Sequence, residues 1–154
     1  MNVNDLAAAL RNCAVGLRPV EAGVALLTSN GTFLHRDDFT SRFISHGTSG
    51  TTPMAAIGWA AATAALHACE LPCSGGERRI LQLAASLAEG VPVDLRDTVT
   101  GLDDHNAARL LVAIGHAAGK RTENIGPKRT NLLVVPGAGQ ILTTALSDQR
   151  RAKR

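Results

Sequence analysis

The chain has 154 residues, 45% of them hydrophobic, and its 16 basic and 13 acidic residues give a formal net charge of +3. This length suits one domain with an extension, and no run of about 18 apolar residues marks a membrane-spanning helix. Three cysteines, an odd number, fit reduced thiols in a cytoplasmic protein better than a disulfide framework. With no Tyr and 3% aromatic residues, the core must consist of Ala, Leu, Val and Ile, which favours closely packed helices.

The charges are divided unevenly along the chain. From Lys120 to Arg154 eight basic residues stand against two acidic ones, whereas residues 1–119 hold eight basic and eleven acidic residues. We therefore divide the chain into a helical body, 1–119, and a basic, partly flexible C-terminal extension, 120–154. Within the body, the Gly-, Ser- and Thr-rich stretch 47–53 is the best candidate for a linker and an internal boundary.

The first half of the body predicts four helices. One spans Asp5–Cys13 with Asn4 as its cap, and a second follows Pro19, because proline is favoured at the first helical position. A third begins at residue 37 or 38, where two aspartates can cap it. The fourth covers about residues 59–69. No segment before residue 130 has the alternation that predicts a strand.

The second half contains the two best-marked helices. Ser74 and Glu77 form a capping box at the start of the first, and Gly90 can supply the left-handed residue that ends it. A short helical turn over 93–102 follows, and the acidic pair 103–104 begins the last helix. Together these elements predict a mainly α protein, a compact orthogonal bundle of about six helices. The apolar stripe expected in the last helix is Ala107, Leu110, Leu111 and Ile114.

The segment 74–103 begins with Ser-Gly-Gly-Glu, continues to Asp97 and ends with Thr-Gly-Leu-Asp. It resembles the signature helix, Walker B strand and D-loop of ABC-transporter nucleotide-binding domains, a resemblance that implies ATP binding. However, Asp94 and Arg96 interrupt the apolar run of a buried strand, and Thr98 occupies the position of the family's catalytic glutamate. No GxxxxGK[ST] loop occurs upstream. We therefore interpret the segment as a capped helix and an acid-capped turn.

A second resemblance covers roughly residues 15–119. The apolar helix pair, the RDDF segment, the Trp-led helix and the strings LPCSGGERR and GLDDHN are similar to a family of small helical proteins from high-GC Gram-positive bacteria. The resemblance implies one cooperative helical body and brings no activity with it.

No group of residues has the pattern of a catalytic site. His67, Cys69, Glu70 and Cys73 form the densest cluster of potential metal ligands, since zinc prefers thiolate and imidazole. Closed zinc sites usually combine two paired motifs, and the sequence has no second cluster. We therefore predict no catalytic residue, no metal site and no cofactor.

The first functional hypothesis is a non-enzymatic protein-interaction or regulatory module. It would act through a helical face, with Arg78 and Arg79 as polar contacts and an unknown protein or a second copy as partner.

An alternative function is nucleic-acid binding, because Lys and Arg side chains neutralise phosphates. A third alternative is a degenerate fragment of an ABC-type nucleotide-binding domain. Residues 93–97 would present two carboxylates, Asp94 and Asp97, to the negatively charged DNA backbone, so the helical body is not expected to bind it. Nucleic-acid contacts are therefore expected from the basic extension alone. The residues expected to make them are Lys120, Arg121, Lys128, Arg129, Arg150, Arg151, Lys153 and Arg154.

Overall fold

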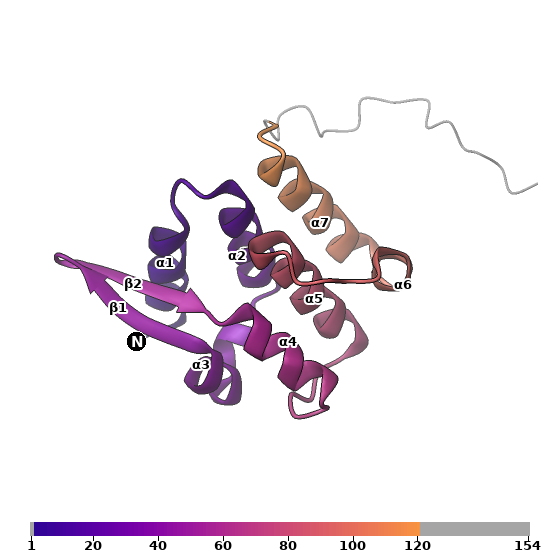
Figure 1. Cartoon of the computed structure of the whole chain (residues 1–154), viewed down its shortest axis with the longest axis horizontal. Coiled ribbons are helices and arrows are strands. Elements are labelled where there is room, and N and C mark those ends of the chain that lie inside the picture. Colours follow the sequence, from indigo (N-terminus) through magenta and orange to yellow (C-terminus); the bar gives the residue numbers. More distant parts are fainter. Residues whose placement is uncertain (1, 121–154) are drawn as a thin grey trace, which may run out of the picture.

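The computed structural model describes residues 2–120 and confirms a mainly helical fold (Figure 1). Seven α-helices, one short 3-10 helix and one β-hairpin occur in this part of the chain. None of these helices combines the length and apolar character needed to cross a bilayer. The elements are α1 (Val3–Ala14), α2 (Arg18–Asn30), η1 (Phe33–His35), α3 (Asp37–Phe43), β1 (Ile44–Ser49), β2 (Thr52–Ile57), α4 (Trp59–His67), α5 (Gly75–Glu89), α6 (Leu95–Thr100) and α7 (Asp104–Ala117).

Helices α2 and α5 pack against each other at the centre of the fold. They approach closely at Gly23, where an added Cβ would lie 2.6 Å from the carbonyl oxygen of Ala84 and 2.8 Å from the Cβ of Ala88. The absence of a side chain at this position therefore permits the close packing of the two helices. Around this contact, both helices contribute fully buried side chains to one core, including Leu26, Leu27, Ile80 and Leu81.

Side-chain caps mark where α1, α5, α6 and α7 begin. The Ser74 hydroxyl accepts from the Glu77 N–H, the Glu77 carboxylate accepts from the Ser74 N–H, and Gly90 ends α5 with φ of 69°. These predictions are confirmed. The prediction that Asn4 caps the first helix is wrong. Asn2 has the extended backbone of a cap and its side chain accepts from the Asp5 N–H, three residues on.

The prediction of no strand before residue 130 is also wrong. β1 and β2 form an antiparallel hairpin that pairs Ile44 with Ile57 and Ser49 with Thr52, so the expected linker lies inside a paired element. The hairpin projects from the helical body (Figure 1). Only Ile44, Ala55 and Ile57 are buried along it. The alternation that marks a half-buried strand is therefore missing from most of its length.

Helix α7 buries a narrower face than its apolar pattern predicted. Leu110 and Ala113 are buried, but Leu111 and Ile114 are 58% and 43% exposed. The reason is that α7 packs mainly on α2, with fewer contacts to α5, so residues on its other sides have no element over them in the described part. In α6, Leu95 is likewise exposed, at 59%.

Replacing Gly23 with Ala should destabilise the protein by about 2 kcal/mol, because the new methyl group collides with backbone and forces α2 and α5 apart. The loss should exceed the gain of about 1 kcal/mol in helix propensity. Urea unfolding followed by circular dichroism measures it. Gly76→Ala is the matched control: it is also a helical glycine, but its Cβ would meet only Asn106 Nδ2 at 3.6 Å. An unchanged midpoint for Gly23→Ala would contradict the packing argument.

Candidate binding groove

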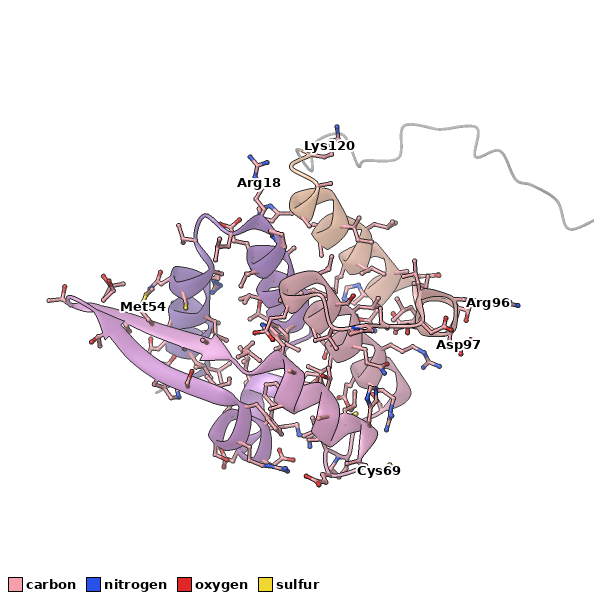
Figure 2. All side chains as sticks on the ribbon, in the orientation of Figure 1. Arg18, Met54, Cys69, Arg96, Asp97 and Lys120 are labelled. Carbon is pink, nitrogen blue, oxygen red and sulfur yellow. The ribbon has the colours of Figure 1, made fainter. Side chains whose placement is uncertain are left out.

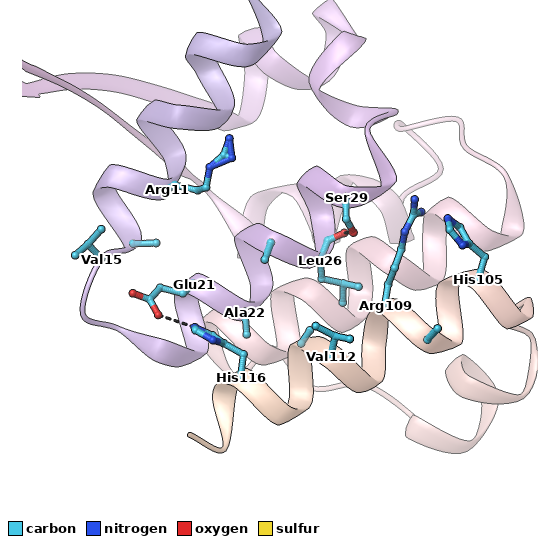
Figure 3. A pocket seen from close by; sticks show the side chains of 14 residues that line it. Arg11, Val15, Glu21, Ala22, Leu26, Ser29, His105, Arg109, Val112 and His116 are labelled. Atoms are coloured by element: carbon cyan, nitrogen blue, oxygen red, sulfur yellow. Dashed lines mark hydrogen bonds and ion pairs between the residues drawn. The ribbon is translucent and has the colours of Figure 1, made fainter. Parts of the chain in front are cut away.

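A groove of about 670 Å³ lies over α2, with α1 on one side and α7 on the other (Figure 3). Its floor and walls are mostly small or branched apolar side chains, and charged side chains stand around them. The lining residues are Arg11, Ala14, Val15, Glu21, Ala22, Ala25, Leu26, Ser29, His105, Ala108, Arg109, Val112, Ala113 and His116.

At one end, Glu21 of α2 holds the C-terminal half of α7. Its Oε2 lies 2.6 Å from Nε2 of His116, and its Oε1 accepts from the Gly16 N–H at 2.9 Å. The hydrogen bond from Gly16 and then that from His116 lower the pKa of the Glu21 carboxyl from its ordinary value. The same carboxylate therefore joins the α1–α2 turn, α2 and α7.

At the other end, a polar cluster joins the start of α7 to the end of α2. Asp103 caps α7 by accepting from the Asn106 N–H at 2.8 Å, and its second oxygen accepts from the Asn106 side chain at 2.7 Å. The hydrogen bond from the Asn106 backbone is the largest cause that lowers the pKa of the Asp103 carboxyl. Asn106 Oδ1 in turn accepts long hydrogen bonds of 3.5 Å from Asn30 and Arg109.

The charges of the groove are unequally compensated. Glu21 is engaged by Gly16 and His116, whereas neither Arg11 nor Arg109 forms an ion pair with any residue in the described range 2–120. The Ser29 hydroxyl donates to the Leu26 carbonyl of its own helix at 2.9 Å. The groove therefore offers an apolar floor bordered by two guanidinium groups.

The arginines predicted as interaction residues lie elsewhere. Arg78 and Arg79 are half-buried in the first turns of α5. The Arg79 guanidinium contacts Gly101, where even a methyl group would overlap it, so this side chain packs between α5 and the turn before α7. Of the basic residues predicted to contact nucleic acid, Lys120 lies just after α7 (Figure 2). The other seven lie outside the described residues, and their role stays a prediction.

Two of the four residues considered as metal ligands, His67 and Glu70, contact other side chains. Glu70 forms an ion pair of 2.8 Å with Arg42, and His67 Nε2 lies 3.2 Å from Gln82 Nε2. Burial raises the pKa of the Cys73 thiol. Between residues 2 and 120 no three His, Cys, Asp or Glu side chains are grouped so that they could hold a metal ion.

Residues 93–97, which resemble a Walker B strand in sequence, form a loop and the first turn of α6, with Asp94 as the cap. Neither protein-family models, nor curated proteins, nor solved structures match this chain. The resemblance to a family of small helical proteins therefore stays a prediction, while the ABC-like segment has the capped helix and the acid-capped turn by which we interpreted it.

Sequence reasoning did not find the groove. Glu21 and His116 are 95 positions apart, and no motif joins them. Ala22, Ala25 and Ala108 carry no chemical signal by themselves. One signal was present in the sequence. Arg109 and His116 lie seven positions apart, and hence on one face of α7, which indicates that this face is not buried in the core.

Replacing Glu21 with Gln should lower the free energy of unfolding at neutral pH and make this free energy less dependent on pH. The pKa of the Glu21 carboxyl is lower in the folded protein than in the unfolded chain. The carboxylate therefore contributes fully to the free energy of unfolding above its unfolded-state pKa, and this contribution is lost as the pH falls through its folded-state pKa. The difference in urea midpoint between wild type and Glu21→Gln should therefore shrink as pH falls from about 6 to about 3.

Glu89→Gln is the control for this pH series. Glu89 is exposed and accepts no hydrogen bond from the described residues, so this variant should follow wild type throughout. A constant difference between wild type and Glu21→Gln at every pH would contradict the assigned role of the carboxylate.

Proposed function

We propose that this chain is a non-enzymatic protein-interaction module whose groove binds a short amphipathic helix of a partner protein. The observation that carries the proposal is the pairing of an apolar floor with two arginines that have no ionic partner among the described residues. Helix-in-groove recognition needs this combination, since apolar anchors supply affinity and charges at the border fix orientation.

The dimensions of the groove favour a helix of about three turns. From His105 to His116, α7 rises about 16 Å along the groove, at 1.5 Å per residue. Small residues on α2, Ala22 and Ala25, leave room for the side chains of a partner helix. At the border, Val15 and Val112 are 72% and 44% exposed, and they would lose contact with water when the groove is filled.

The charges point to an acidic partner. Arg11 projects from α1 and Arg109 from α7, so the two guanidinium groups lie on opposite sides of the floor (Figure 3). Arginine suits carboxylate recognition because its planar fork can form two parallel hydrogen bonds. The partner expected here is therefore a helix with leucine-type anchors on one face and Asp or Glu at the edges of that face.

A helix-constrained peptide of about 14 residues, with Leu at i, i+4 and i+7 and Glu flanking them, tests the proposal by fluorescence anisotropy. Wild-type protein should bind it. The double variant Arg11→Glu/Arg109→Glu should bind at least about tenfold more weakly and should instead prefer the same peptide with Lys in place of Glu.

Arg96→Glu is the matched control, because Arg96 is exposed on α6, on the far side of α7 from the groove (Figure 2). It should bind both peptides as wild type does. Absence of binding by wild type would overturn the proposal, and so would an equal loss in the Arg96 variant.

A further inference from the structure

The hairpin presents one edge whose backbone groups point away from its partner strand. At its base the Gly58 N–H donates to the Phe43 carbonyl at 2.8 Å, next to the pair Ile44 and Ile57. Hydrogen-bonded and non-bonded pairs alternate along an antiparallel ladder. The N–H and C=O groups of His46 and Thr48 therefore face outward from β1. The pairs that bond across the hairpin are Ser45 with Ala56, Gly47 with Met54, and Ser49 with Thr52.

The outer edges of the two strands differ. On β2, Pro53 has no N–H, its carbonyl accepts from Asn12 Nδ2 at 3.1 Å, and the strand packs on α1. On β1, the outward groups of His46 and Thr48 form no hydrogen bond with any residue of the described part. Proteins usually protect such edges with proline, charge or a covering element. The six residues of β1 include no proline and no Lys, Arg, Asp or Glu.

We infer that β1 of one copy pairs antiparallel with β1 of a second copy, which joins two hairpins into a four-stranded sheet. With the two-fold axis at Gly47, His46 lies opposite Thr48 of the second copy and Thr48 opposite its His46. The outward N–H and C=O groups then form four hydrogen bonds. The contact is isologous, since the same edge serves both copies.

The side chains at the axis permit this approach. A Cβ on Gly47 would meet nothing within 4 Å, so this face of the strand is open. β1 has no Lys, Arg, Asp or Glu, so self-pairing places no two such side chains opposite each other. This lack of charge also distinguishes the partner of the β1 edge from that of the groove, whose two arginines favour an acidic partner. A second copy supplies a strand without such charges whose outward N–H and C=O groups match those of β1 in register when the two-fold axis lies at Gly47.

The interface is small, so the dimer is weak and concentration-dependent. Sedimentation equilibrium of the full chain from about 10 µM to about 1 mM should show the mean mass rising toward twice that of the monomer.

Two substitutions in β1 test the pairing. His46→Pro removes an outward N–H and leaves the hydrogen bonds between β1 and β2 intact. Thr48→Lys places two ammonium groups near each other across the axis. Both variants should stay monomeric at about 1 mM. Ala56→Lys places the same charge at an exposed position of β2, away from the outer edge of β1, and should associate as wild type does.

Amide hydrogen exchange at low and high concentration distinguishes this edge from any other contact. The amides of His46 and Thr48 should exchange more slowly at high concentration, while those of Gly47 and Ser49, already bonded to β2, should change little. A wild-type chain that remains monomeric at 1 mM would overturn the inference. Association without this alternating protection, or unchanged in both edge variants, would overturn it as well.

Discussion

The close approach of α2 and α5 at Gly23 is the constraint on which the other contacts depend. A glycine facing the Ala84 carbonyl lets two helix backbones meet without a side chain between them, which a chain poor in aromatic residues can use to exclude water from its core. With α2 fixed in the centre, α1 and α7 pack against it, α4 packs against α5, and the hairpin rests on α1 through β2. The groove and the β1 edge are therefore both positioned relative to this one helix pair.

The groove follows from the way α7 is attached. Polar contacts to α2 hold it at both ends, Glu21 with His116 at one and Asn30 with Asn106 at the other, while Leu110 and Ala113 supply its buried apolar contacts. A helix held in this way leaves its other sides exposed. Because α1 lies beyond α2, these exposed side chains and those of α1 border the same apolar floor.

The groove and the β1 edge would recognise different chemistry. The groove combines apolar area with guanidinium groups, so its affinity should come from side chains and its preference from charge. The edge offers only backbone donors and acceptors on a neutral strand, so its affinity should come from main-chain hydrogen bonds. The groove is lined by residues of α1, α2, α7 and the α1–α2 turn, whereas the edge belongs to β1, so a substitution in one surface changes no residue of the other.

The sequence by itself determined the local structure. Ser74 with Glu77, Gly90, Asp94 and Asp103 located helix ends because a cap needs only residues within one turn. It failed at the hairpin, whose Ser, Thr and Gly residues lack an apolar face, and at α7, where Leu111 and Ile114 were expected in the core. Only the tertiary structure decided the groove. Its arginines, and the pair of Glu21 with His116, come together through the packing of helices far apart in the chain, which no local pattern records.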